Sequence, residues 1–188
     1  MTAGRVLVVR LSAVGDCVHA LPAVRALRAA LPGAHVAWAV DDRTAPLLEG
    51  LDAVNEFLVM PRRSLRGKSR WARWRALAAY RRRLRSGAFD AAVDFQGLAK
   101  SALVGYFSGA SRRIGPPRGD GARELSWLFY NCTPEIPPEA RHVAEKSRAL
   151  LAPLGVDVSA PLPQPELPAH PGAAARVESA LGGMSLAA

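Results

Sequence analysis

The sequence predicts an α/β fold in which a parallel sheet carries helices on both faces. Short apolar runs rich in β-branched residues alternate with segments whose apolar residues recur every three or four positions. This order of strands and helices implies βαβ units, because a helical crossover makes consecutive strands parallel. The length of 188 residues suits one domain with a full hydrophobic core.

The first unit of this pattern occupies the N-terminus. Residues 5–10 (RVLVVR) form a β-branched run typical of a buried parallel strand, and residues 11–15 form a small, flexible loop. Pro22 suits the first turn of the helix that follows, and residues 32–33 (Pro-Gly) end it. The apolar stripe of this helix recurs at helical spacing, at Leu21, Val24, Leu27 and Leu31.

The same alternation continues to residue 107. Strands are predicted at residues 35–40, 54–60 and 89–94, and helices at residues 44–51, 68–85 and 100–107.

The C-terminal third differs in composition. Residues 112–121 are rich in Gly and Pro and predict a loop, whereas residues 122–131 and 138–154 have helical patterns. Five prolines between residues 155 and 171 predict an extended linker, which a short helical segment at residues 173–181 follows. Because little sequence comes after the linker, we expect the chain to be an N-terminal fragment of a longer protein.

The positive charge of the chain is concentrated in one segment. The net charge is +9, and residues 61–89 hold eleven basic side chains and no acidic one, whereas the remaining residues hold 14 basic and 16 acidic side chains. One interpretation is a solvated helix face whose buried stripe is Trp71, Trp74, Leu77, Ala78 and Leu84. The other, which the missing counter-charge favours, is a surface that binds phosphates, carboxylates or membrane headgroups.

Cysteine content and hydropathy indicate a reducing, cytosolic compartment. Cys17 and Cys132 form no CxxC pair and no disulfide framework. The N-terminal apolar run is interrupted at Arg10 and Asp16, so it is no secretory signal. No window approaches the ~18 apolar residues that a membrane span needs. The four histidines do not cluster with the cysteines at metal-ligand spacing, so no metal is expected.

The loop after the first strand is the first candidate site. In open parallel sheets, ligands bind beyond the carboxyl ends of the strands, where Ser12, Gly15 and Asp16 lie. Gly15 allows a close approach to the backbone. Asp16 is either a helix cap or first-turn acid, or a functional carboxylate. The loop matches neither GxGxxG nor the P-loop, so no NAD or ATP site is predicted.

The segment DFQGLAKS after the strand at residues 89–94 is the second candidate. Asp94 and Gln96 could hydrogen-bond hydroxyls, and Lys100 could bind an anion at the start of the following helix. The alternative is an ordinary strand-to-helix turn with a capping residue.

Together these segments resemble the ADP-heptose:lipopolysaccharide heptosyltransferases, and most closely their heptosyltransferase I branch. Four collinear stretches within residues 5–155 carry the resemblance: RVLVVRLSAVGDCVHALPAVRALRAALPG, FDAAVDFQGLAKSAL, ARELSWLFYN and RHVAEKSRALLAPLG. It implies a GT-B fold, of which residues 1–155 would be the Rossmann-like acceptor-binding half. Residues 156–188 would be the interdomain linker and the truncated start of the missing donor domain.

The resemblance also implies a reaction and a set of site residues. Asp16 would be the general base of an inverting, metal-independent transfer of heptose from ADP-heptose to Kdo-bearing lipid A. Ser12 and Gly15 would line the acceptor site with Asp94 and Gln96. The anionic groups of the acceptor would meet the basic residues Arg62, Arg63, Arg66, Lys68, Lys100 and Arg123.

The resemblance further implies where the chain acts and what it needs. No cofactor is expected, since ADP-heptose is a substrate held mainly by the absent C-terminal domain, and the chain alone should bind acceptor without transferring heptose. A location in the cytoplasm, peripheral to the inner membrane, follows from a lipid-linked acceptor and an anionic membrane surface; no obligate protein partner is evident. Two alternatives remain: a nucleic-acid-binding module in which Trp71, Trp74 and Tyr80 stack on bases, and a relative with another sugar specificity, such as heptosyltransferase II.

Overall fold

The computed structural model describes residues 4–168 and Ser179 and contains a five-stranded, all-parallel sheet in the order β3-β2-β1-β4-β5. Because β2 and β4 flank β1 on opposite sides, the connections that leave β1 and β4 diverge beyond their carboxyl ends. This is the position at which open α/β sheets form a ligand crevice. The strands are β1 (Arg5–Val9), β2 (His35–Asp41), β3 (Glu56–Met60), β4 (Ala91–Asp94) and β5 (Arg112–Ile114).

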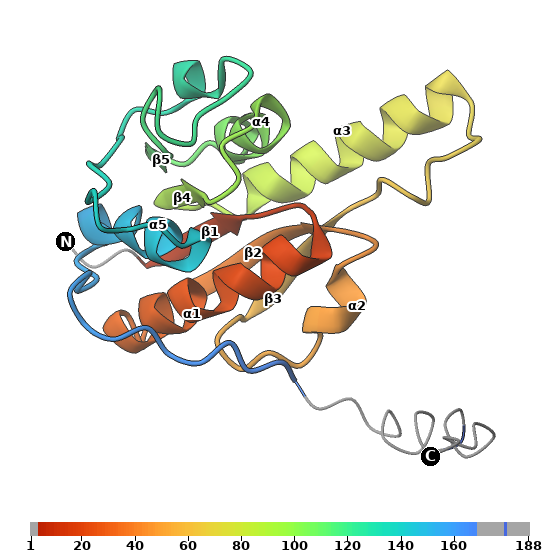
Figure 1. Ribbon diagram of the computed structural model, residues 1–188. Helices are drawn as coiled ribbons and strands as arrows, with labels where there is room; N and C mark the ends of the chain where they lie inside the picture. Colours follow the sequence, from red (N-terminus) through yellow and green to blue (C-terminus); the bar gives the residue numbers. More distant parts are fainter. Residues whose placement is uncertain (1–3, 169–178, 180–188) are drawn as a thin grey trace, which may run out of the picture.

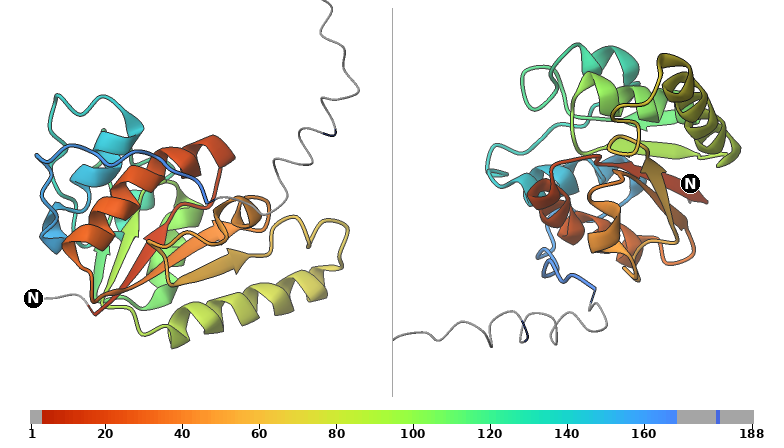
Figure 2. Two further views of the ribbon diagram at one scale, coloured as in Figure 1. Left: turned by 90° about the horizontal axis from the view of Figure 1, so that it is seen from below. Right: turned by 90° about the vertical axis from the view of Figure 1, so that its right-hand side faces the viewer.

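Helices cover both faces of the sheet, as predicted (Figure 1). One face carries α1 (Val14–Ala30), α2 (Ala45–Leu48) and α5 (Val143–Ala149), and the other carries α3 (Arg70–Ser86) and α4 (Ala99–Ser108). Figure 2 (left) shows the sheet lying between α1 and α3. The N-terminal half of α3 extends past the sheet edge (Figure 1).

The sheet separates two apolar cores. Side chains of β1 alternate between them, with Val6 and Val8 packing towards α1, and Leu7 and Val9 towards α3 and α4. All four are fully buried, and burial of such a side chain contributes about 1.5–3 kcal/mol. Trp38 is also fully buried in the first core, where its Nε1 donates to the Arg10 carbonyl at 3.2 Å.

The start of α1 differs from the prediction. The helix begins at Val14, so Val14 and Gly15 are its first turn and Pro22 lies in its interior. Apolar periodicity located the buried stripe, with Leu21, Val24 and Leu27 buried as expected, but it gave no sign of the earlier start. Asp16 is therefore an acid of the first helical turn.

The region after α4 also differs from the prediction. Part of the predicted loop at residues 112–121 is strand β5, which pairs with β4 through its backbone and buries Ile114 completely. The predicted helix at residues 122–131 is only a 3₁₀ turn, Ser126–Phe129, which begins after Leu125 in a left-handed conformation (φ 62°). The predicted helix at residues 138–154 is limited to α5 and the 3₁₀ turn Ala152–Leu154.

Residues 156–168 have no helix or strand, in agreement with the expected extended segment. They run beside α1, where Arg25 lies 3.9 Å from the Glu166 carboxylate (Figure 1). The helix predicted at residues 173–181 lies outside the described residues, apart from Ser179, and the domain division at residue 155 stays a prediction. Within the described part of the chain, no helix is long and apolar enough to cross a bilayer.

Candidate active site

A pocket of about 870 Å³ lies at the carboxyl ends of β1, β2 and β3. The loop between β1 and α1 forms one wall, and the segments that follow β2 and β3 form the other. The pocket therefore occupies the crevice expected of a parallel sheet. Five of the residues predicted for the site line it: Ser12, Gly15, Arg62, Arg63 and Arg66.

Asp16 follows this wall directly and is held in a defined orientation. Its Oδ2 accepts a hydrogen bond from the Ala13 amide at 3.3 Å and forms an ion pair of 2.8 Å with Nη2 of Arg10. The Asp16 side chain is 45% exposed, whereas that of Arg10 is 10% exposed. Among the described residues, no hydrogen bond or ion pair engages Asp16 Oδ1. One oxygen is thus fixed by the protein while the other is open to a ligand.

Arg10 is the fixed partner in this pair. It follows β1 directly, is buried, and also donates through Nη1 to the Phe95 carbonyl after β4. A guanidinium held on two sides orients a carboxylate better than a flexible ammonium would. The sequence analysis did not include Arg10 in the site, although its position one strand residue before the loop could have suggested it.

Two contacts connect the β1 loop with the turn after β4. Gln96 Oε1 accepts from the Leu11 amide at 3.0 Å, and Lys100 Nζ lies 3.4 Å from Ser12 Oγ. The predicted residues Gln96 and Lys100 thus reach the β1 loop without lining the pocket. Gln96 holds the loop, and the Lys100 ammonium adds positive charge beside Ser12.

Asp94 is buried and fully engaged, so the expectation that it hydrogen-bonds a substrate hydroxyl is wrong for this conformation. Its exposed fraction is 2%, and Oδ1 accepts from the amides of Gln96 and Gly97. Oδ2 accepts from the hydroxyls of Ser101 (2.8 Å) and Tyr130 (2.7 Å). Desolvation raises the pKa of Asp94 despite these hydrogen bonds, because burial penalises the charged form. Asp94 shapes the turn that presents Gln96 and Lys100.

Two carboxylates of the pocket were missed by the sequence analysis. Asp41 accepts from the amide and hydroxyl of Thr44 and lies 3.9 Å from Arg62 Nη1. Asp42 accepts from the Arg63 amide at 2.8 Å and 2.9 Å, and from the Ser64 amide at 2.9 Å. Desolvation is the largest single influence on the pKa of Asp42 and raises it, but the hydrogen bonds from Ser64 and the neighbouring amides together outweigh it, so the pKa lies below its usual value. A tandem Asp-Asp at the end of a predicted strand is the signal that could have found them.

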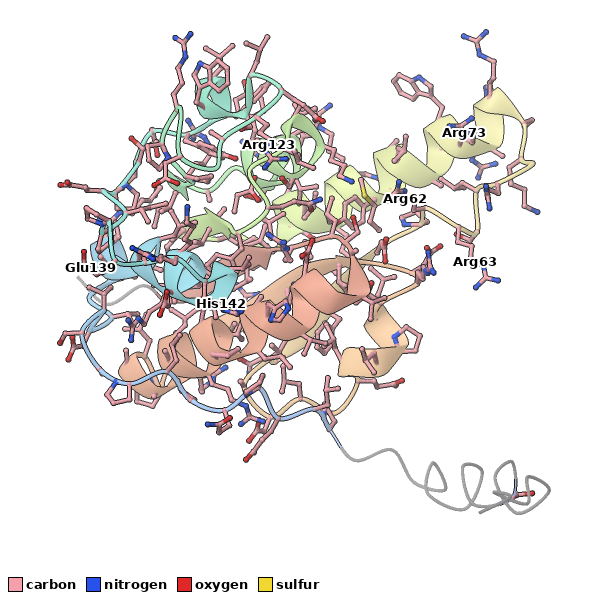
Figure 3. The ribbon with its side chains drawn as sticks, in the orientation of Figure 1. Arg62, Arg63, Arg73, Arg123, Glu139 and His142 are labelled. Atoms are coloured by element: carbon pink, nitrogen blue, oxygen red, sulfur yellow. The ribbon has the colours of Figure 1, made fainter. Side chains whose placement is uncertain are left out.

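These carboxylates position the arginine loop between β3 and α3. The hydrogen bonds that Asp42 accepts fix the loop backbone at Arg63, so the guanidinium groups extend from an anchored segment (Figure 3). Arg62 and Arg63 are exposed. Lys68, further along the loop, is exposed and outside the pocket lining. Arg123 lies beside the start of α4, where its amide donates to the Gly97 carbonyl at 2.8 Å, and does not line the pocket.

Comparison with known proteins identifies the family. The sequence model of glycosyltransferase family 9 (heptosyltransferase) matches residues 77–185, which are more than half of the chain. The chain belongs to this family. The resemblance noted in the sequence is thereby confirmed.

Individual relatives agree with this assignment. Lipopolysaccharide heptosyltransferase 1 of Salmonella typhimurium is 33% identical over 151 residues, which cover 79% of this chain and 47% of the relative. The enzyme of the same name from Pseudomonas aeruginosa is 30% identical over 153 residues, which cover 79% of this chain and 42% of the relative. The chain thus spans about half the length of the curated relatives it matches.

Solved structures of this family share the fold. The Escherichia coli heptosyltransferase WaaC with ADP-2-deoxy-2-fluoro heptose aligns with a TM-score of 0.71 at 29% identity, covering 81% of this chain and 49% of that one. E. coli ADP-heptose lps heptosyltransferase II aligns with a TM-score of 0.68 at 25% identity, covering 94% and 50%. The predicted fold class, the Rossmann-like parallel sheet of one half of a GT-B glycosyltransferase, is confirmed.

Proposed function

We propose that this family 9 chain forms the acceptor side of a lipopolysaccharide heptosyltransferase, with Asp16 as general base. The observation that carries the proposal is the state of the Asp16 carboxylate. Arg10 and the Ala13 amide hold Oδ2, while the side chain as a whole is half-exposed next to a pocket that Arg62, Arg63 and Arg66 line. A helix cap alone would need no buried guanidinium beside it.

The proposed reaction is a single inverting displacement. An acceptor hydroxyl oxygen attacks the anomeric carbon of ADP-heptose, forming the new glycosidic C–O bond as the bond to ADP breaks. The hydroxyl proton passes to Asp16 Oδ1, and ADP leaves with the bonding electron pair. General-base catalysis of this kind typically contributes about 10²–10⁴-fold in rate. The proposal includes no metal or cofactor, and the donor contacts are left to residues outside this chain.

The acceptor proposed is a Kdo-bearing lipid A. Its carboxylates and phosphates would pair with Arg62, Arg63 and Arg66, all of which line the pocket. Guanidinium groups bind such oxyanions through paired hydrogen bonds. The names of the relatives at 30–33% identity, all lipopolysaccharide heptosyltransferase 1, favour this acceptor over that of heptosyltransferase II. Lys68 and Arg123 would contact the same anions at the margin of the pocket.

The nucleic-acid alternative is less well supported. It explains the charge of residues 61–89 but gives no role to the pocket or to the Arg10–Asp16 pair. A peripheral location at the cytoplasmic face of the inner membrane belongs to the proposal, since the acceptor is lipid-linked and the segment after β3 is basic.

Binding and transfer test the proposal separately. The purified chain should bind Kdo-lipid A, and Arg62→Ala/Arg63→Ala should weaken binding, whereas Asp16→Asn should not. Transfer is measured after grafting residues 1–155 onto the remaining half of the E. coli heptosyltransferase I, and Asp16→Asn should reduce turnover about 10²–10⁴-fold. The matched control is Asp52→Asn, which removes an exposed carboxylate whose one ion-pair partner within residues 4–168 is Arg25. An Asp16→Asn graft that transfers heptose at the parental rate would refute the role of Asp16.

A further inference from the structure

Helix α3 exposes large apolar side chains that one of the two interpretations of its sequence placed in a buried stripe. Trp71, Trp74 and Leu77 have exposed fractions of 69%, 76% and 46%, so that interpretation is wrong for these residues. The residues of α3 that are buried are Tyr80 and Leu84. Two neighbouring exposed tryptophans on one helix are unusual and indicate a surface that contacts something other than water.

These side chains adjoin an apolar groove between α3 and α4 with a volume of about 1020 Å³. Trp74 and Leu77 form its α3 wall, and Leu103, Val104 and Phe107 form its α4 wall. Five cationic side chains line the groove beside these hydrocarbon groups: Arg81, Arg82, Arg85, Lys100 and Arg113. The groove therefore suits a ligand that combines hydrocarbon chains with anionic groups.

The rim of the groove is cationic. Arg81 stacks over the Phe107 ring at 4.8 Å, and Arg75 over the Trp71 ring at 5.0 Å, so guanidinium and apolar groups alternate along α3. Of the eleven basic residues between positions 61 and 89, only Arg62 and Arg83 lie within 4 Å of a carboxylate of residues 4–168. Nine cations thus have no carboxylate partner in the described part of the chain.

Shared lining residues connect the groove with the active-site pocket. A smaller hollow of about 310 Å³ shares Arg62 and Arg66 with the pocket, and shares Met60 and Leu77 with the groove. The path leads from the Asp16 loop across arginines to hydrocarbon, which is the order of polar head and acyl chains in a lipid. Figure 3 shows Arg62 and Arg63 before α3 and Arg73 on its projecting half.

We propose that the exposed face of α3, with the α3–α4 groove, docks onto an anionic phospholipid bilayer. Trp71 and Trp74 lie at the headgroup–acyl boundary, where amphipathic indole rings are stable, and the unpaired arginines bind lipid phosphates. The inference rests on the proposed function in one respect: docking here brings a lipid-linked acceptor to the pocket. The aliphatic α4 wall favours lipid over nucleic acid, since bases stack on rings and not on Leu103 or Val104.

Vesicle binding by the full 188-residue chain tests this proposal without any sugar substrate. We expect co-sedimentation with phosphatidylglycerol vesicles at low salt, much weaker binding at high salt, and little binding to phosphatidylcholine. Dibrominated phosphatidylglycerol should quench the tryptophan emission. Trp71→Ala/Trp74→Ala should abolish the quenching and weaken vesicle binding at least about tenfold, with unfolding unchanged because both side chains are exposed. The control Trp127→Phe, which removes the ring stacked on Arg118, should keep both signals.

Several results would overturn the docking surface. The first is that the chain does not bind phosphatidylglycerol vesicles. The second is that the parental and Trp71→Ala/Trp74→Ala proteins bind these vesicles equally. The third is that the tryptophan quenching by dibrominated lipid persists in that variant. If an RNA oligomer shifts the tryptophan emission more than vesicles do, the face binds nucleic acid. If raising the protein concentration alone shifts it more than vesicles do, the face binds a second copy of the chain. If Asp16-dependent transfer persists while vesicles fail to bind, only this inference fails; if vesicles bind while Asp16→Asn is silent, only the proposed function fails.

Discussion

The buried carboxylate of Asp94 allows a quantitative test of how the turn after β4 is held. In Asp94→Ala, the amides of Gln96 and Gly97 lose their acceptor, and a buried unsatisfied donor costs about 1–3 kcal/mol, so the free energy of unfolding should fall by about 2–6 kcal/mol. In Asp94→Asn, the retained oxygen still accepts from both amides. The new NH₂ group faces the hydroxyls of Ser101 and Tyr130, which can accept, so the cost should be about 1 kcal/mol or less at neutral pH.

The pH dependence adds a second criterion with a defined sign. The folded pKa of Asp94 is raised above its usual 3.8, chiefly by desolvation, so the stability this group contributes is fully present below 3.8. It is lost as the pH rises through the folded pKa. Asn cannot titrate, so Asp94→Asn should gain stability relative to the parental protein between pH 4 and pH 7. Other titrating groups are common to both proteins and cancel in the difference.

Urea unfolding of the three proteins, followed by circular dichroism at pH 4 and pH 7, measures both effects. A parental–Asn difference that does not change with pH would refute the assigned pKa shift. A loss in Asp94→Asn as large as in Asp94→Ala would refute the hydrogen-bond assignment to Oδ1.

Two further predictions concern the helix that follows the site loop. A Cβ on Gly15 would meet no protein atom within 4 Å, so Gly15→Ala should keep or raise the free energy of unfolding by up to about 1 kcal/mol. It should still weaken acceptor binding about tenfold, because Gly15 lines the pocket; unchanged affinity in a titration would show that the acceptor does not approach it. Burial raises the pKa of the Cys17 thiol to about 12, so iodoacetamide at pH 8 should modify Cys132 in the folded protein and Cys17 only after unfolding, as mass spectrometry would reveal. Equal labelling of both thiols under native conditions would contradict the packing of α1.

Local sequence patterns predicted the central strands and the helices between them well. Within the three central runs, residues 6–10, 36–40 and 91–94 are buried on both faces, so hydrophobicity alone locates them. Strand β5 was missed because two of its three residues are arginines, so it has no apolar pattern. It forms through backbone hydrogen bonds with β4, which the local sequence does not reveal. The start of α1 was missed because its first turn holds a glycine and an acid that apolar periodicity does not register.

The site was predicted in part for a similar reason. Position at the end of a strand indicated Ser12, Gly15 and the arginines Arg62, Arg63 and Arg66, and all of these line the pocket. It could not indicate whether a polar side chain points into the pocket or into the protein. Asp94 points inward because hydroxyls from α4 and from Tyr130 surround it, and these contacts are distant in sequence. Helical spacing allowed a buried stripe through the tryptophans of α3 as one interpretation, because such spacing does not show that the sheet ends beneath them.

The N-terminal half of α3 extends past the sheet edge, so it is less stable locally than the C-terminal half. Its C-terminal half is anchored by Leu84 and by Tyr80, whose hydroxyl donates to the Leu58 carbonyl at 3.3 Å. Its N-terminal half has a Ser69 cap but no core beneath it, and an isolated helix of two turns is marginal in water. The first turns of α3 therefore open at a small fraction of the global unfolding free energy, with amides that exchange well before those near Leu84. The first turns of α3 can therefore change conformation without disturbing β1 and α1, which position Arg10 and Asp16.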